Sequence, residues 1–544
     1  MGKDDGVNAI DEAFARLADA ALPAALPNGA VRRGLQDAGI RFAALGGTLE
    51  ARWQQALAEL AECVRPIVGD RPALNEGGVY RGSWLESTAT INAEILSRFV
   101  PDVTRDTHLL FARHQRDDGM LPYKVTESGP GFSQIQIVTP LARTVWNHYR
   151  LSGDRAYLRE MHAAMVRYDA WLATYRDTLG TGGVEAFCTF DTGHDLSPRF
   201  WFAPDRCLHG DATRCDPAAP SVPYVAPDLT ANVACQRAYL ALIAAELGED
   251  PEPWRRKAQE SLDALWTQCF DETDGTFYDR DRTGRLVRIQ SDVLLRVLAC
   301  EVGDDGFFAA ALERFLMHTG KFLSHYGFTS LAMDDPRFDH DYTRNSWGGP
   351  VNFLSLVRAP HAFEHHGRVA ELATTAMPVL AALAAADRFP QCLDPWTGTA
   401  GYTEAYSPSI LWMLDAIERW SGILSRPDGE LWFTGLSPTR LEHGAARAVA
   451  YARTVDGMPY ELAADDERVV VRRDGAEHMA FPRGWRVVTD RTGEPSAVVG
   501  LLPTPVSGRL VCGATDIALS ISANERVELR GGPATAMGFI GPHA

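Results

Sequence analysis

The chain has 544 residues and a formal net charge of −18 at pH 7, from 53 basic and 71 acidic side chains. An acidic surface repels nucleic acids and anionic membranes, so neither is expected as a partner. The length exceeds what one hydrophobic core usually serves, which predicts one large domain and a smaller one.

The N-terminal segment lacks the apolar stretch of a signal peptide, because four charged residues interrupt it between Val7 and Leu22. No stretch approaches the length of a membrane-spanning helix. The nine cysteines are an odd number without a Cys-x-x-Cys pair, which favours reduced and mostly buried thiols in a cytoplasmic protein. The spacing between Cys207 and Cys215 matches neither usual zinc signature, so we expect no metal and no cofactor.

Apolar residues recur at helical spacing through the first three quarters of the chain. The expected helices cover residues 49–64, 84–99, 104–114, 138–150, 155–175, 229–247, 253–269, 291–300, 307–318, 351–366, 369–385 and 407–420. This series has no intervening strand pattern and indicates antiparallel helix pairs, arranged as a bundle, a solenoid or a closed ring. No fixed repeat period is present, which argues against an open solenoid.

The helical period ends near residue 425. Three β-rich runs follow at residues 467–473, 485–489 and 517–522, separated by Asp-Gly, Thr-Gly and Ser-Gly turns. We therefore expect a mainly helical domain with an N-terminal helical extension over residues 1–425. A small antiparallel, sandwich-like β-domain is expected over residues 426–544, as a structural lid or as an extra ligand-contacting surface.

Five loops between the expected helices combine aromatic rings with acid, amide or Arg groups. They span residues 79–86, 115–123, 191–201, 341–350 and 389–398. Aromatic faces stack on sugar rings while the polar groups bind hydroxyls, and loops at one end of a helix ring converge on a central cavity. Together they indicate a carbohydrate site, although surface turn chemistry also explains each loop taken singly.

The third of these loops carries the candidate catalytic acid, Asp195. Its neighbours in sequence are Gly193, His194, Ser197, Pro198, Arg199 and Trp201. Such polar and aromatic surroundings tune a carboxyl group for proton donation. A helix-capping role for Asp195 is the alternative interpretation.

Several further motifs follow in a characteristic order. They are Gln115 to Tyr123, Ser133-Gln134, Trp146, Pro227 to Ala231, Phe277-Tyr-Asp279, Tyr326 to Ala332, Trp347-Gly-Gly-Pro350 and Asp394-Pro-Trp-Thr-Gly398. From about Trp84 to Met413 the chain resembles the clan of inverting α-glycosidases built on six helical hairpins. That clan includes trehalases, glycoside hydrolase family 63 and the mannosylglycerate hydrolases. The resemblance implies an (α/α)6 barrel and gives Asp195 the role of general acid.

The second catalytic group is where the chain departs from these relatives. An inverting mechanism also needs a carboxylate, about 6.5 to 9.5 Å from the acid, to activate water. In the family a Glu stands four residues before the Pro of the Pro-x-Thr-Gly turn, and counting back from Pro395 gives Gln391. An amide cannot accept the proton, so hydrolysis should slow by a factor of about 100 to 10,000.

Three explanations of Gln391 remain open. The chain carries a deliberate Glu-to-Gln change, or another acid such as Asp394 or Glu404 serves as base, or the protein binds or rearranges a glycoside without hydrolysing it. We name Asp195, Gln391 and Glu404 as the candidate catalytic residues.

Two further departures concern substrate binding. Gly348 stands where relatives have Arg, and Arg344 is the candidate to compensate. Glu86 lies one residue beyond the acid of the family's Trp-Asp pair, and its alternative is a first-turn helix Glu favoured by the dipole. The expected substrate contacts are Trp84, Glu86, Gln115, Tyr123, Gln134, His194, Arg199, Trp201, Arg344, Trp347 and Trp396.

We therefore expect an inverting glycosidase acting on an α-linked, gluco- or manno-configured small glycoside or oligosaccharide. The first alternative is a catalytically silent carbohydrate-binding relative. The second is an epimerase or lyase on the same fold, which needs a His pair facing the sugar, and His194 and His209 are the only candidates near the loop of the acid.

Overall fold

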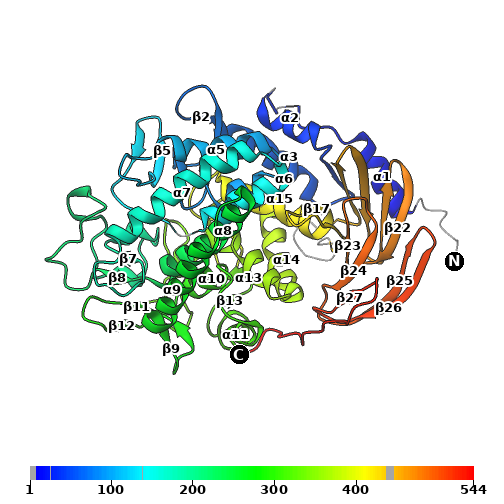
Figure 1. Ribbon diagram of the computed structural model, residues 1–544. Helices are drawn as coiled ribbons and strands as arrows, with labels where there is room; N and C mark the ends of the chain where they lie inside the picture. The colour runs from blue at the N-terminus through cyan, green and yellow to red at the C-terminus, as the bar shows by residue number, and fades with distance from the viewer. Residues whose placement is uncertain (1–7, 25, 28, 138, 437–445) are drawn as a thin grey trace.

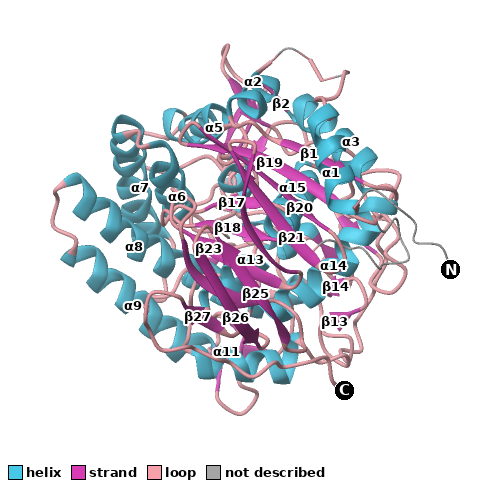
Figure 2. Ribbon diagram, turned by 90° about the vertical axis from the view of Figure 1, so that its right-hand side faces the viewer, coloured by secondary structure: helices cyan, strands magenta, loops and turns pink. Residues whose placement is uncertain are grey.

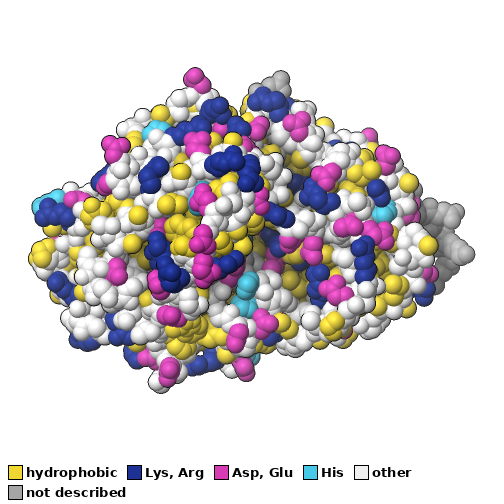
Figure 3. Space-filling view, viewed as in Figure 1, with side chains coloured by type: hydrophobic (Ala, Val, Ile, Leu, Met, Phe, Trp, Pro, Cys, Tyr) yellow, Lys and Arg dark blue, Asp and Glu magenta, His cyan; other side chains and the backbone are white. Residues whose placement is uncertain are grey.

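The computed structural model describes residues 8–24, 26–27, 29–137, 139–436 and 446–544. Helices form one part of the molecule, and strands gather in layers at its other side (Figure 1). Seen after a quarter turn, the strands lie in front of the helices (Figure 2). On the face shown in Figure 3, Lys and Arg side chains are interspersed with Asp and Glu.

The helical part follows the expected order. Its helices are α3 (Leu49–Cys63), α4 (Ile91–Leu96), α5 (Pro101–Arg113), α6 (Leu141–Ser152), α7 (Arg155–Tyr175), α8 (Pro227–Leu247), α9 (Glu252–Cys269), α10 (Val293–Leu298), α11 (Asp305–Ala311), α12 (Phe353–Leu356), α13 (Ala359–His365), α14 (Val369–Ala385) and α15 (Ser407–Ser421). Each expected segment overlaps one or two of them. Residue 138, the expected start of one segment, lies outside the described residues.

Local signals explain the pairing of these helices. Gly153 follows the last residue of α6 and Gly248 follows the last residue of α8, both with a positive φ that glycine adopts without strain. The Asp154 side chain then accepts the backbone N–H groups of Ala156 and Tyr157 and caps α7. The chain therefore reverses within a few residues, and α6 and α7 pack as an antiparallel pair.

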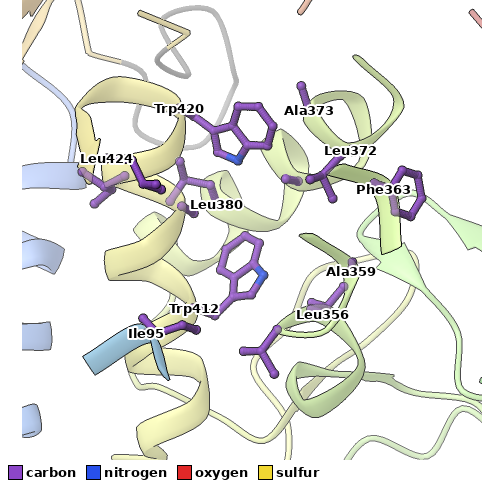
Figure 4. Packing of buried hydrophobic residues seen from close by; sticks show 14 of the residues in the cluster. Ile95, Leu356, Ala359, Phe363, Leu372, Ala373, Leu380, Trp412, Trp420 and Leu424 are labelled. Atoms are coloured by element: carbon purple, nitrogen blue, oxygen red, sulfur yellow. The ribbon is translucent and has the colours of Figure 1, made fainter. Parts of the chain in front are cut away.

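Burial separates inner from outer helices. Helix α8 buries residues on most of its circumference, whereas its partner α9 buries one stripe that includes Ala258, Leu265 and Cys269. Near the β-layers, the apolar core is built around Trp412 and Trp420 on α15, which pack with Leu380 of α14 (Figure 4).

Short strands tie the loops of the helical part together. They are β2 (Val64–Pro66), β3 (Pro72–Leu74), β4 (Ser83–Trp84), β5 (Lys124–Thr126), β6 (Gly129–Gly131), β7 (Glu185–Ala186), β8 (Tyr224–Val225), β9 (Phe270–Asp271), β10 (Thr276–Phe277), β11 (Asp279–Arg280), β12 (Leu286–Val287), β13 (Leu323–Ser324), β14 (Gly327–Phe328), β15 (Val351–Asn352) and β16 (Cys392–Leu393). Strands β15 and β16 pair with each other and join two of the five polar and aromatic loops.

Two antiparallel sheets form the β-layers. The seven-stranded sheet runs β1-β19-β20-β21-β22-β25-β26 and the five-stranded sheet runs β17-β18-β23-β24-β27. Their strands are β1 (Arg41–Ala44), β17 (Ile423–Ser425), β18 (Leu431–Thr434), β19 (Val449–Val455), β20 (Met458–Ala464), β21 (Arg468–Arg473), β22 (Ala476–Pro482), β23 (Trp485–Thr489), β24 (Pro495–Gly500), β25 (Val506–Cys512), β26 (Thr515–Ile521) and β27 (Arg526–Glu528). The three expected β-rich runs are β21, β23 and β26, so the predicted antiparallel β-structure is confirmed.

Both ends of the chain cross between the two parts. The N-terminal segment, expected as a helical extension, forms α1 (Ala9–Asp19) and α2 (Ala30–Asp37) but also supplies β1, which pairs with β19. The C-terminal tail returns to the helical part beside α11 (Figure 1). There the backbone N–H of Thr319 donates to the carbonyl oxygen of His543 over 2.8 Å. The domain boundary at residue 425 remains a prediction, and β17 begins two residues before it.

Two other expectations concern single residue types and helix length. All nine cysteines are free thiols, and all but Cys215 are buried. Among the described residues, no helix combines the length and the apolar character that crossing a bilayer requires.

Candidate active site

Asp195 lies in a tightly fixed loop between α7 and α8. Its backbone oxygen accepts the N–H of Trp347 over 3.0 Å. Gly193, two residues earlier, has a φ of +68°, and a Cβ there would lie 2.3 Å from the Glu86 carboxylate. Only glycine fits this approach, so the sequence Gly-x-Asp brings two carboxyl groups into one site.

The surroundings of Asp195 favour its protonated form. Burial, together with the negative charge of Glu86 and then that of Asp205, raises the pKa of Asp195 to about 7. A carboxyl group with this pKa still carries a proton in a large share of molecules at neutral pH. Asp195 therefore meets the requirement for a general acid.

Gln391 lies on the same network as Asp195. The Asn345 side chain joins them: its Nδ2 donates to Asp195 Oδ2 over 2.5 Å, and its Oδ1 accepts from Gln391 Nε2 over 2.9 Å. The hydroxyl of Tyr80 donates to Gln391 Oε1 over 2.9 Å. One amide group thus separates the candidate acid from the base position named by the family pattern.

The backbone of Gln391 is held firmly. Its N–H donates to the Tyr402 carbonyl over 2.8 Å, and its carbonyl accepts the N–H of Phe353 over 3.0 Å. Strand β16 begins at the next residue and pairs with β15. These bonds fix where the side chain at position 391 enters the site.

The two other candidate bases have different surroundings. The Asp394 carboxylate accepts the backbone N–H groups of Trp396 and Thr397, which stabilises the Pro-x-Thr-Gly turn. Glu404 is exposed. Among the described residues, no hydrogen bond links either carboxylate to Gln391 or Asp195. The geometry therefore favours neither of them as a replacement base.

Arg199 was expected to contact substrate, but its guanidinium is fully occupied inside the protein. It donates to both carboxylate oxygens of Asp228 and to both of Asp279, at 2.6 to 2.9 Å. The remaining contact is to Nδ1 of His194 at 2.8 Å. All donors of the guanidinium are thus used, and the side chain is 2% exposed. Arg199 anchors the loop of the acid, so the expected sugar contact is not supported.

His194 is likewise a buried anchor. Because Arg199 can only donate, Nδ1 of His194 accepts and its Nε2–H donates to Asp292 over 2.7 Å. Burial, and next the positive charge of Arg296, lowers the pKa of His194 to about 4. His209, the other candidate for a His pair, is exposed. The geometry therefore gives no support to the epimerase or lyase alternative.

Glu86 is buried in the wall beside Asp195. It accepts from Gln136 Nε2 over 2.5 Å, and Gln134 Nε2 donates in turn to Gln136 over 3.3 Å. Helix α4 begins only at Ile91, so Glu86 is not the first-turn residue of a helix. Its Oε1 has no hydrogen-bond partner in the described part of the chain, nor have the two Nη groups of Arg358. The two groups form a buried ion pair instead, with Arg358 Nη2 3.9 Å from Glu86 Oε1.

Aromatic side chains differ in their access to the site. The ring of Trp84 lies 5.7 Å from that of Tyr80, and Lys124 lies over the rings of Trp84 and Tyr123 at 5.6 and 5.4 Å. Trp347 is buried behind Asp195, with its ring 4.9 Å from that of His194.

The outer candidates lie on exposed positions. Trp201 is 56% exposed and Trp396 is 48% exposed, which leaves their faces open to a ligand. Arg344 is exposed and pairs with Asp339 at 2.9 Å and Asp341 at 2.8 Å.

Gln115 has a different role from the one expected. Its Nε2 donates to the carbonyl oxygens of Gly119 and Ala164 over 2.7 and 2.8 Å, and Arg167 donates to its Oε1. The amide therefore ties its own loop to α7, and its hydrogen bonds are made within the protein. A sugar contact by Gln115 is not supported.

Four residues of the site were missed by the sequence reasoning. They are Tyr80, Gln136, Asn345 and Arg358. Tyr80 and Asn345 lie within two of the five polar and aromatic loops, which was the available signal. Gln136 has a positive φ of 45°, an unusual conformation for a side chain of this kind and one that often marks functional sites.

One cluster among the described residues has metal-ligand spacing. Cys188, Asp191 and Cys207 present their ligand atoms close together. Arg176 already donates to Asp191 over 2.6 Å, with its guanidinium over the ring of Phe187. The positive charge that a metal would bring is therefore supplied by arginine.

A family model described as the mannosylglycerate hydrolase MGH1-like glycoside hydrolase domain matches residues 80–409, more than half of the chain. The chain belongs to this family. The matched region contains Asp195, Asn345 and Gln391, so the residues of the network lie within the family domain. No curated protein sequence matches the chain.

Solved structures share the fold at low sequence identity. The GH63 mannosylglycerate hydrolase from Thermus thermophilus in complex with Tris is 20% identical, with a TM-score of 0.56 over 66% of this chain and 98% of that one. The neutral trehalase Nth1 from Saccharomyces cerevisiae is 14% identical, with a TM-score of 0.50 over 64% and 73%. A sialidase is 14% identical, with a TM-score of 0.60 over 88% and 44%. The expected (α/α)6 barrel followed by β-structure is thereby confirmed.

Proposed function

We propose that the protein is an inverting glycoside hydrolase for an α-linked, gluco- or manno-configured small glycoside, with Asp195 as general acid. The observation that carries this proposal is the placement of Asp195, with its pKa near 7, one amide away from the base position of the family. Proton donation from Asp195 to the glycosidic oxygen would leave the aglycone neutral as the bond to the anomeric carbon breaks.

Gln391 sets the expected rate. Water that attacks the opposite face of the sugar must lose a proton, and an amide cannot take it. The chain as it stands should therefore hydrolyse slowly, or hold its glycoside without turnover. A silent carbohydrate-binding relative is the second candidate function, and it is favoured by the same observation, a neutral residue at the base position.

The Glu86–Arg358 pair in the wall suggests how the sugar is held. Glu86 Oε1 and an Nη group of Arg358 face each other at 3.9 Å without a hydrogen bond, so a sugar hydroxyl placed between them would accept from Arg358 and donate to Glu86. Glucose is bound in one structure of the Thermus thermophilus mannosylglycerate hydrolase, and D-glycerate in another. We infer that a neutral hexose occupies the corresponding space here, with Trp84 at its side.

The decisive experiment compares this chain with Gln391→Glu on a panel of α-glucosides and α-mannosides, following the product anomers by NMR. We expect Gln391→Glu to gain at least about a hundredfold and to release the β-anomer first. Asp195→Asn in the Gln391→Glu background is the control and should lose the gain. If neither protein turns over any glycoside, but a sugar raises the melting temperature of the unaltered protein, the proposed function becomes carbohydrate binding without hydrolysis.

A further inference from the structure

The hydrogen bonds between Tyr80 and Asp195 all point the same way. Tyr80 donates to Gln391, Gln391 donates to Asn345, and Asn345 donates to Asp195. Asp195 only receives at the end of this chain, which is the arrangement that suits an ionised carboxylate.

The same atoms allow the reverse arrangement. A half turn about the bond that joins a side-chain amide to the preceding carbon exchanges the positions of its NH2 donor and its oxygen acceptor. If both amides turn, protonated Asp195 donates to Asn345 Oδ1, Asn345 Nδ2 donates to Gln391 Oε1, and Gln391 Nε2 donates to the Tyr80 oxygen. Every link is again a hydrogen bond with one donor and one acceptor. The series of three hydrogen bonds thus has one complete arrangement for each protonation state of Asp195.

We propose that Asn345 and Gln391 form a reversible hydrogen-bond chain that stabilises Asp195 both with and without its proton. Asn345 is then a positioning residue for the general acid, and Gln391 is what allows the reversal. The role given to Asp195 rests on the proposed function, but the coupling between the chain and the proton on Asp195 does not require turnover.

A glutamate at position 391 would behave differently. An ionised carboxylate only accepts, so it would take both the Tyr80 hydroxyl and Asn345 Nδ2. Asn345 Oδ1 would then face Asp195, a contact that is satisfied only while Asp195 keeps its proton. Glutamate therefore locks the acid in its protonated form, whereas glutamine lets the acid lose and regain its proton without breaking the chain.

The charged groups around Asp195 make the donor from Asn345 important. Glu86 faces Asp195 from the segment before α4, and Asp205 faces it from its own loop, and both oppose ionisation. Tyr80 faces it as a neutral phenol. The positive charges of Arg296 and Arg358 act on Glu86. The amide of Asn345 is thus the group that donates a hydrogen bond to the ionised carboxylate.

The hydrogen-bond chain is tested by a pH titration of the ligand-free protein, in which the Asp residues are labelled with 13C and followed by NMR. The Asp195 signal is identified by its absence in Asp195→Asn. Asn345→Leu should raise the pKa of Asp195 by about one unit, because a hydrogen bond to a charged group is stronger than one to a neutral group. Tyr80→Phe, which removes no atom touching Asp195, should raise it by a smaller amount. Gln115→Leu is the control for the loss of a remote structural amide and should leave it unchanged.

A second measurement on the unaltered chain keeps the test independent of folding defects. The side-chain amide signals of Asn345 and Gln391 should move with the same pH midpoint as Asp195 and stay constant in Asp195→Asn. Amide signals that stay constant through the titration, or an unchanged Asp195 pKa in Asn345→Leu, would overturn the proposal. Coupled titration together with no hydrolysis by Gln391→Glu would refute the proposed function alone. Hydrolysis by Gln391→Glu without coupled titration would refute the hydrogen-bond chain alone.

Discussion

Replacing Arg199 by methionine tests whether the residue anchors the loop of the acid or binds substrate. Methionine keeps much of the side-chain length but leaves Asp228 and Asp279 buried without their shared cation. Removing one partner of a buried, hydrogen-bonded pair costs about 3–5 kcal/mol. Arg199→Met should therefore lower the free energy of unfolding by several kcal/mol.

The loss of unfolding free energy in Arg199→Met should also depend on pH, in a direction set by the pKa of Asp228. Although burial opposes it, the charge of Arg199 holds the pKa of Asp228 at about 2, below its usual range. In Arg199→Met the pKa of Asp228 should rise above its unfolded value, so that group destabilises the fold as the pH rises through the new pKa. The stability deficit should therefore be larger at pH 8 than at pH 4.

Urea unfolding followed by tryptophan fluorescence at both pH values measures this deficit. Arg206→Met, an exposed change in the same loop, is the matched control and should be nearly neutral. A normal stability at both pH values, together with a weaker affinity for sugars, would refute the anchoring role and restore Arg199 as a substrate contact.

Three further predictions follow from single contacts. Because the pKa of Asp195 is raised to about 7, the folded state binds its proton more tightly than the unfolded chain between about pH 4 and 7. Asp195→Asn removes this pH-dependent contribution to stability. The melting temperature of Asp195→Asn relative to that of the unaltered protein should therefore increase as the pH rises from 5 to 8, and a difference that stays constant would contradict this. Gly193→Ala places a Cβ against Glu86 at a positive φ and should cost about 1–2 kcal/mol from the backbone alone and weaken sugar binding, measured by calorimetry. Asp154→Ala removes the cap of α7 and should cost about 1 kcal/mol while sugar binding stays unchanged.

Helical periodicity was sufficient to find the helices, and the family resemblance indicated the barrel, but neither revealed the short segments between the helices. Residues 84–99 were expected as one helix, yet only α4 is helical within them, and Trp84 belongs to strand β4. Strands of two residues are too short to show alternation, so β15 and β16 could not be recognised. They form because Val351 and Cys392 lie in loops that the barrel brings together.

The site shows the same division between local and distant signals. Asp195 and Gln391 were found from motifs that lie within a few residues of each of them. Arg199 was expected at the substrate because its partners, Asp228 and Asp279, are distant in sequence, and only the structure shows that they hold its guanidinium. A polar residue beside a catalytic acid can hold the loop or the substrate, and only the tertiary partners distinguish the two.

A double-mutant cycle between positions 345 and 391 separates charge from hydrogen-bond direction. Gln391→Glu should raise the pKa of Asp195 in two ways: by its negative charge, and by turning Asn345 so that its oxygen faces the acid. The charge acts through space and survives in Asn345→Leu, whereas the second effect needs the amide.

The increase caused by Gln391→Glu should therefore be smaller in the Asn345→Leu background, and the two changes should be non-additive. The Asp195 carboxyl signal measures all four proteins without requiring turnover. Additive shifts would mean that position 391 influences the acid by charge alone. A clear coupling would mean that the glutamine at position 391 controls where the proton of the acid is held, in addition to leaving the base position neutral.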